Sequence, residues 1–187
     1  EYQQVLGDAK FTNLRVLKTL PYPDGRPGFY FIKLQYADNA DQIFAAEAER
    51  RRALLSTELI IMDEPIMVEY SALDMGEIQN AFDGDENTLI RTLEANPLRI
   101  ILYFQGAQSL QEITVRMGGA PSRLAVTLTP AGQGTALSYE QEYKETPEPH
   151  WETLTFPAVR VSQLQIDLYN VYDEEPAHVH LWELILR

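Results

Sequence analysis

After residue 70 the chain repeats short runs in which apolar and polar side chains alternate. In the run 112–117, Ile113, Val115 and Met117 point one way, while Thr114 and Arg116 point the other. Residues of the turn-forming types Gly, Pro and Asn separate these runs. This pattern is typical of antiparallel strands with one buried face, and it predicts an antiparallel β-sandwich rather than parallel βαβ units. The strand candidates are 98–104, 112–117, 123–129, 152–156, 161–168 and 178–186.

Residues 1–70 have a mixed pattern. A partial strand alternation at 10–17 and an aromatic-rich run at 29–36 flank a connector with three prolines and two glycines. A helix is predicted from about residue 40 to 55, capped by Asp38 or Asn39. Two short strands, 59–62 and 66–70, are expected to form a hairpin. We therefore expect two domains: an α/β extension over 1–70 and a sandwich over 71–187.

Composition excludes several classes of function. The chain has 187 residues, of which 45% are hydrophobic, enough for a core. Its net charge of −13 disfavours nucleic acid as a partner, and the basic cluster at 50–52 lies beside acids on the predicted helix. The absence of cysteine removes disulfides and thiolate chemistry. No apolar run approaches the length of about 18 residues that spans a bilayer, so we expect no direct membrane insertion by this sequence.

The sequence begins Glu-Tyr-Gln-Gln, with neither an initiator Met nor a signal peptide. We expect it to be a segment of a longer polypeptide, whose targeting signal or membrane anchor lies elsewhere.

The stretch 80–88, NAFDGDENT, has the composition of a cation-binding loop. Asp83 and Asp85 supply charge, Thr88 adds a hydroxyl, and Gly84 permits a sharp reversal of the backbone. The spacing also resembles an EF-hand loop, but Thr88 stands where that loop requires glycine and no helices flank it. An EF-hand is therefore not expected. From the residues alone, a hydrogen-bonded turn remains the alternative to a cation site.

The same stretch, with Arg91 and Thr92 following, resembles the N-terminal signature of the coagulation factor 5/8 type C, or discoidin, family. That signature usually reads A-F-D-G-D/N-x-x-T-x-W-x-S/T. Other features of the family follow in order over about residues 68–187: a strand after a proline (98–104), an apolar strand ending in Gly (113–119), a W-x-x-L-x-F segment (151–156) and an acid inside the apolar closing strand (181–185). The resemblance implies a mainly β protein, a galactose-binding-like jelly-roll β-sandwich, here with an N-terminal α/β extension carrying one helix.

The resemblance also implies a structural calcium site. Carried over by position, Asp83 and Glu183 would be side-chain ligands and Thr88 a hydroxyl and carbonyl ligand. Backbone carbonyls would come from Asn80, Asp85 and Trp182. An acid within an apolar strand is costly to bury without a partner, which a cation would supply. The alternative is a capped turn in which Asp83 accepts backbone N–H bonds and Glu183 lies at a solvated edge.

Two departures from the family pattern are evident. Ile90 stands where the family usually has Trp, and the cysteine pair of many animal members is absent, which indicates a bacterial type of module. Ligand contacts in that family vary so much that only Arg91, next to the signature loop, is transferred as a candidate sugar contact.

Other candidate sites have plain alternatives. His178 and His180 lie on one side of a strand and would suit zinc, with Glu175 or His150 as a third ligand, although exposed histidines explain them as well. The aromatic residues His150, Trp151, Tyr143, Tyr169 and Tyr172 would suit a sugar-binding loop, although core or strand-face positions explain most of them.

Nothing in the sequence indicates catalysis. Its serines lie in no nucleophile-elbow context, and no acid pair is distinguishable from a solvated surface. We therefore expect no enzyme activity from this chain.

Two functions remain. The first is a non-catalytic carbohydrate-binding accessory module of a larger extracytoplasmic protein, at the cell surface or secreted, with a glycan and the rest of its polypeptide as partners. The second is a structural or interaction domain of a membrane-anchored protein that binds no sugar. The extension at 1–70 favours the second, and residues 25–36 faintly resemble soluble tails of bacterial membrane glycosyltransferases.

Overall fold

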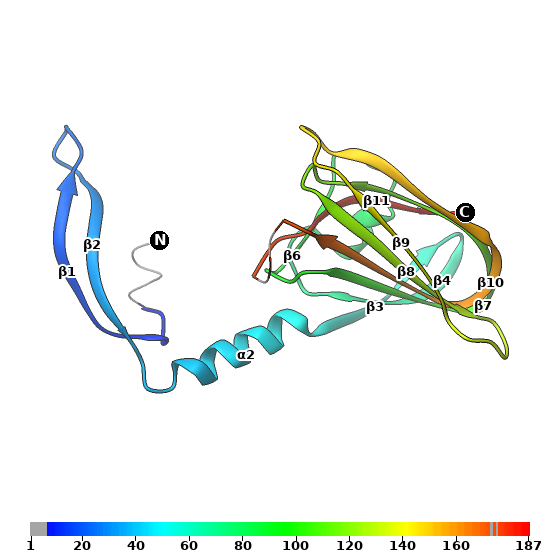
Figure 1. The fold of residues 1–187 in the computed structure, drawn as a ribbon, viewed down its shortest axis with the longest axis horizontal. Helices are drawn as coiled ribbons and strands as arrows, with labels where there is room; N and C mark the ends of the chain where they lie inside the picture. Colours follow the sequence, from blue (N-terminus) through cyan, green and yellow to red (C-terminus); the bar gives the residue numbers. More distant parts are fainter. Residues whose placement is uncertain (1–6, 173, 175) are drawn as a thin grey trace. The chain divides into compact units, whose positions relative to one another are not determined.

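The computed structural model describes residues 7–172, 174 and 176–187 (Figure 1). The chain forms two compact units, Glu1–Arg50 and Arg51–Arg187. We describe each unit by itself.

The first unit contains a long antiparallel ribbon, strands β1 (Phe11–Pro21) and β2 (Pro27–Tyr36). Its turn closes where the Tyr22 N–H donates to the Arg26 carbonyl at 2.8 Å, and Gly25 adopts the positive φ of 84° that this reversal requires. The helix α2 (Ala40–Arg52) follows, and Ala40 is its only buried residue. The helix ends three residues earlier than predicted because the next strand begins at Leu54.

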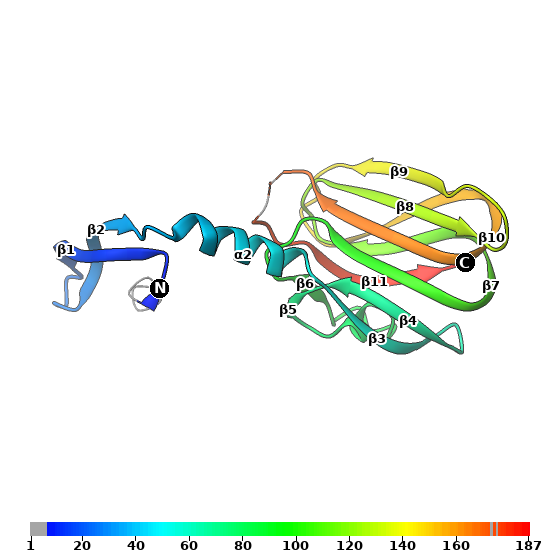
Figure 2. The same cartoon turned by 90° about the horizontal axis from the view of Figure 1, so that it is seen from below.

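The second unit is a sandwich of antiparallel strands (Figures 1 and 2). Its elements are β3 (Leu54–Ile61), β4 (Glu64–Ser71), β5 (Leu73–Met75), the 3-10 helix η1 (Ile78–Ala81), β6 (Ile90–Thr92), β7 (Leu98–Met117), β8 (Ser122–Pro130), β9 (Leu137–Tyr143), β10 (His150–Asn170) and β11 (His180–Leu186).

Strands β7 and β10 are long enough to belong to both layers of the sandwich. They pair along nearly their whole length, from His150 opposite Met117 to Leu168 opposite Leu98. In one layer the first part of β7 lies between β4 and β10, and β10 in turn pairs with β8. In the other layer the last part of β7 pairs with β11. The register shifts within β10 allow both strands to bend from one layer to the other.

The alternation read from the sequence determines which side chains fill the space between the layers. Ile113, Val115 and Met117 are at most 1% exposed, as their spacing predicts. Leu164, Ile166 and Leu168 on β10 are likewise buried, while Gln163 and Gln165 between them are half-buried. The antiparallel jelly-roll sandwich expected from the sequence is therefore the fold of this unit.

Three details differ from the sequence-based expectation. The hairpin β3–β4, which we had placed in the 1–70 extension, belongs to the second unit, because β4 pairs with β7 and contributes the buried Ile66 and Val68. The separate strand candidates 98–104 and 112–117 are one strand, β7, and 152–156 and 161–168 are one strand, β10. Strand β9 was not predicted, because its sequence LSYEQEY is mostly polar. It lies at the edge of its layer and is mostly exposed.

Candidate functional site

The signature loop 80–88 is closed by one threonine. The Thr88 Oγ1 lies 3.1 and 3.2 Å from the Asp83 carboxylate oxygens, 3.0 Å from the Asp85 carbonyl and 3.5 Å from the Asn80 carbonyl. Gly84 turns the loop with a positive φ of 75°. The carboxylate, the hydroxyl and two carbonyl oxygens thus converge on the inside of the loop.

Glu183 from β11 completes this cluster. Its Oε1 accepts a hydrogen bond of 2.8 Å from the Gly84 N–H, and the residue is only 3% exposed. Burial raises the pKa of the Glu183 carboxyl, and contact with Asp83 and the charge of Asp85 act in the same direction, against the hydrogen bond from Gly84. An acid that is costly to ionise is therefore in contact with the Asp83 carboxylate and near the charge of Asp85.

These donors fit a hard cation such as Ca²⁺, which prefers carboxylate, carbonyl and hydroxyl oxygens on a loop. Five of the six residues carried over from the family pattern lie together: Asn80, Asp83, Asp85, Thr88 and Glu183. The sixth, Trp182, adjoins the cluster in the chain, and its ring stacks on His180 with centroids 6.1 Å apart.

The alternative of a capped turn explains only part of this geometry. Asp83 does accept a backbone hydrogen bond, from the Asp85 N–H at 2.8 Å. Glu183, however, is buried rather than at a solvated edge.

The histidines are engaged in other contacts. His178 Nδ1 lies 2.8 Å from the Thr92 carbonyl, and His150 Nδ1 lies 2.8 Å from the Thr146 hydroxyl. Glu175, a proposed zinc ligand, lies outside the described residues. Within the described ranges, no group of three or more His, Cys, Asp or Glu side chains is placed to hold a metal. The residues expected to bind calcium differ from such a group, because several of their ligand atoms are carbonyl and hydroxyl oxygens rather than carboxylates.

Arg91, the candidate sugar contact, forms an ion pair. Its Nε and Nη2 donate to the Asp74 carboxylate at 2.8 and 2.9 Å, and these bonds are the main reason that the pKa of Asp74 is lowered. Its side chain is 28% exposed. A ligand would therefore have to compete with Asp74 for this guanidinium.

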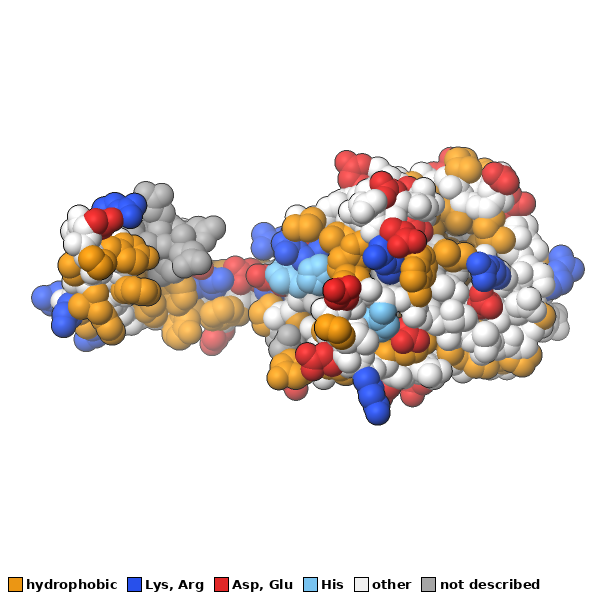
Figure 3. All heavy atoms as spheres, turned by 90° about the horizontal axis from the view of Figure 1, so that it is seen from above, with side chains coloured by type: hydrophobic (Ala, Val, Ile, Leu, Met, Phe, Trp, Pro, Cys, Tyr) orange, Lys and Arg blue, Asp and Glu red, His pale blue; other side chains and the backbone are white. Residues whose placement is uncertain are grey.

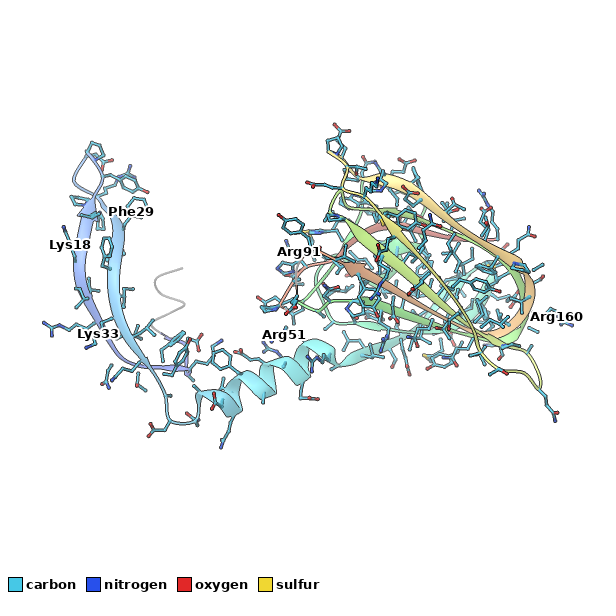
Figure 4. The ribbon with its side chains drawn as sticks, in the orientation of Figure 1. Lys18, Phe29, Lys33, Arg51, Arg91 and Arg160 are labelled. Atoms are coloured by element: carbon cyan, nitrogen blue, oxygen red, sulfur yellow. The ribbon has the colours of Figure 1, made fainter. Side chains whose placement is uncertain are left out.

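Four loops form one end of the sandwich: 93–97, 118–121, 144–149 and the described part of 171–179. Backbone hydrogen bonds join them directly, from Thr146 to Gly119, from Val171 to Pro121 and from Ala177 to Glu94. In Figure 4, Arg91 and Arg51 mark this end and Arg160 marks the opposite one. We call this part of the molecule the loop end.

A pocket of about 810 Å3 opens at the loop end. Polar and charged side chains dominate its lining, with one aromatic ring, that of Tyr169. Its lining includes the side chains of Arg52, Arg99, Arg123, Tyr169, Asn96 and Asn170.

The register of β10 assembles this pocket. It places Asp167 opposite Arg99 on β7 and Tyr169 opposite Arg123 on β8. Of these residues, the sequence analysis singled out only Tyr169. The alternation of apolar and polar residues predicts that Arg99 and Arg123 point out of their strands. Nothing in the sequence shows that one further strand lies between those two strands.

Of the other aromatic candidates, Tyr143 is buried at 8% exposure, whereas Trp151 and Tyr172 are 39% and 76% exposed. No helix in the described part of the chain has the length and apolar character needed to cross a membrane.

Comparison with known proteins gave matches among solved structures alone: no family model and no curated protein matched. The family 32 carbohydrate-binding module of C. perfringens NanJ, solved with galactose, is 17% identical, with a TM-score of 0.53 over 71% of this chain and 98% of that chain. The corresponding module of AlyQ, solved with 4,5-unsaturated mannuronic acid, is 15% identical, with a TM-score of 0.51 over 70% and 98%.

Chitosan-binding module 1 from a Paenibacillus chitosanase/glucanase is 15% identical, with a TM-score of 0.51 over 70% and 98%. At these identities the likeness establishes the fold. It confirms the predicted jelly-roll β-sandwich fold.

Proposed function

We propose that Arg51–Arg187 is a non-catalytic carbohydrate-binding accessory module of a larger extracytoplasmic protein. The main support is that this unit shares its fold with modules solved with galactose and with an unsaturated mannuronic acid, nearly the whole of which it covers. A pocket at the loop end offers polar groups and an aromatic ring, the combination that sugar sites use.

We further propose that loop 80–88 and Glu183 hold a structural calcium ion. The converging oxygens of Asp83, Thr88 and Glu183 support this. The ion would neutralise the carboxylates and tie the loop to the last strand. It would therefore stabilise the sandwich without taking part in any reaction.

Attachment to a larger protein also agrees with one of the matches. One matched structure is a Ruminococcus gnavus GH29 fucosidase with a TM-score of 0.54, and the match covers only 30% of that chain. A module attached to a larger protein is the arrangement that we propose here.

A glycan array in calcium buffer tests the carbohydrate proposal. The chain is first shown to be folded by a cooperative thermal transition. Reproducible binding to a defined set of sugars, reversed by the free sugar, is the expected result. A blank array with folded protein would contradict the proposal.

The ribbon of the first unit supports a second candidate function, a protein-interaction element. Successive residues of β2 alternate between the two sides of the ribbon, so Tyr30, Ile32, Leu34 and Tyr36 share one side, which carries no charge on this strand. The other side carries Lys33 and its cross-strand partner Arg15, with Phe29 and Phe31.

Many of the ribbon's apolar side chains are exposed, including Leu17 at 60%, Phe29 at 64% and Phe31 at 55%. Hydrophobic side chains cluster visibly on this unit in Figure 3, and Figure 4 marks Phe29 beside Lys18 and Lys33. A two-stranded ribbon is marginal in water unless its apolar side packs on something. We propose that it docks on a protein surface, either of the longer polypeptide or of a partner.

Hydrogen exchange tests this second candidate on the chain alone. Amides of β1 and β2 should exchange at least about a hundredfold faster than those of β7 and β10, because only the latter belong to a packed core. Equal protection in a monomer would remove the need for a docking partner.

A further inference from the structure

The pocket at the loop end concentrates positive charge on an acidic protein. The chain has 15 lysines and arginines against 28 acids, and three of those cations, Arg52, Arg99 and Arg123, line this one pocket. We propose that the pocket binds the carboxylate of an acidic sugar, a hexuronic acid within an oligosaccharide. This inference rests on the proposed carbohydrate-binding function and adds to it the ligand class and the residues that select it.

Arg123 is the residue best placed to receive the carboxylate. Its guanidinium lies over the Tyr169 ring, with Cζ 4.2 Å from the ring centroid, which restricts the position of the group. Its Nε is buried and has no hydrogen-bond partner among the described residues, and no acid there lies within ion-pair distance. The residue as a whole is half-buried, and a ligand carboxylate at this point would give Nε an acceptor and the guanidinium a counter-charge.

Arg99 contributes a second guanidinium, but one that is already balanced. Its Nε and Nη2 donate to the two Asp167 oxygens at 2.6 and 3.1 Å, and Gln165 donates to the same carboxylate at 2.7 Å. Its side chain remains 38% exposed toward the pocket region. Arg99 would therefore orient a ligand, while Arg123 would supply the charge that distinguishes an acidic sugar from a neutral one.

The base of the pocket is fixed before any ligand arrives. The Asn96 Nδ2 donates to the Asn170 carbonyl at 2.7 Å, and the Asn170 N–H donates to the Asn96 Oδ1 at 3.1 Å. The Ser71 Oγ accepts a hydrogen bond of 2.9 Å from the Arg99 N–H. These bonds join loop 93–97 to the end of β10 and the start of β7 to the end of β4, so little ordering is needed on binding. Glu174 lines the same pocket and can accept hydrogen bonds from sugar hydroxyls.

The pocket geometry favours a sugar carboxylate over a free inorganic anion. A volume of about 810 Å3 is far larger than sulfate or acetate requires. The aromatic ring of Tyr169 adds an apolar surface that a small anion cannot use. The experiment below separates the two kinds of ligand.

Isothermal titration calorimetry on the full chain in calcium buffer is the test. The probes are trigalacturonic acid, trimannuronic acid, the fully methyl-esterified form of each, and sodium acetate and sodium sulfate alone. At least one uronate should bind, and its esterification, which removes the charge and keeps the rings, should weaken binding about tenfold or more. Acetate and sulfate should bind far more weakly than that uronate.

Two matched variants locate the effect. Arg123→Gln should lose about tenfold or more in affinity for the uronate and should not change the affinity for its ester. Arg160→Gln removes the same charge at the exposed opposite end and should bind like the unchanged chain. Both variants are first shown to keep the thermal transition of the unchanged chain.

Four outcomes would overturn the inference. Equal binding of acid and ester, or an unaffected Arg123→Gln variant, would remove the carboxylate site and leave carbohydrate binding standing. Sulfate binding as tightly as the sugar would replace the sugar site with an anion site. Absence of binding to any sugar, here and on the array, would remove both the inference and the proposed function.

Discussion

The backbone N–H of Gly84 donates a hydrogen bond of 2.8 Å to Glu183 Oε1, which joins two residues 99 positions apart. The signature loop near the start of the sandwich is thus held by an acid of its last strand. The Asp83 carboxylate contacts that of Glu183, the charge of Asp85 lies near, and burial opposes the ionisation of Glu183. The mutual repulsion of these acids is the physical reason to expect a cation at this point.

Calcium should raise the thermal stability of the second unit. An ion at 100 times its Kd adds about 2.7 kcal/mol to the free energy of unfolding, which corresponds to roughly 5 to 11 °C in Tm. Scanning fluorimetry in excess calcium and in chelator measures this difference. Asp83→Asn should abolish it, whereas Asp63→Asn, in the exposed β3–β4 turn, should retain it. Equal Tm values in the two buffers, with no bound metal by elemental analysis, would contradict the calcium site.

Two adjacent glycines should differ sharply in their tolerance of alanine. A Cβ at Gly119 would lie 2.3 Å from the Thr146 carbonyl oxygen, whereas a Cβ at Gly118 would lie 3.7 Å from its nearest neighbours. Gly119→Ala must displace the backbone of loop 144–149 and should lower the free energy of unfolding by about 1–3 kcal/mol. Gly118→Ala is the control and should change it little. Urea unfolding measures both, and equal midpoints would refute the close packing of these loops.

Removing Arg99 from its ion pair with Asp167 should cost more stability than removing Asp167. Asp167 is 7% exposed, while the Arg99 side chain is 38% exposed. Arg99→Met leaves a buried carboxylate with Gln165 as its remaining side-chain partner among the described residues and should cost about 2–3 kcal/mol. Asp167→Asn leaves a guanidinium that reaches solvent and should cost about 1 kcal/mol or less. Urea midpoints at pH 7 compare the two, and a larger loss for Asp167→Asn would contradict this account.

Tyr143 should make stability depend on alkaline pH. Burial raises its pKa to about 12 from an ordinary value of 10, with a smaller contribution from Glu152 in the same direction. The un-ionised phenol is favoured in the folded state, so its contribution is fully present below pH 10 and is lost as the pH rises from 10 through 12. At pH 11.5 the loss should be about 2 kcal/mol relative to pH 8.5.

Tyr143→Phe isolates this effect from the other tyrosines. The Tyr143 hydroxyl is buried without a hydrogen-bond partner in the described part of the chain, so its removal should be neutral or slightly stabilising at pH 7. The variant should then lose less stability between pH 8.5 and 11.5 than the unchanged chain. An identical loss in both proteins would exclude Tyr143 as its source.

The sequence was sufficient to predict features that depend on a single strand or loop. The alternation at 113–117 and 164–168 predicted the buried side chains, because the side-chain period of a strand is independent of what lies across from it. The stretch 80–88 predicted a loop of converging oxygens, because Gly84 and Thr88 act within a few residues of each other. The edge strand β9 could not be predicted, because an edge strand with little burial carries little apolar pattern.

The sequence by itself determined the antiparallel sandwich, the signature loop and the acid in the closing strand that faces it. Tertiary structure alone decided that the β3–β4 hairpin joins the sandwich, and that Arg99 and Arg123 flank one strand and line one pocket. The physical reason is register. Which side of a strand is buried follows from local alternation, but which residues stand opposite one another depends on strand pairing between segments far apart in the chain.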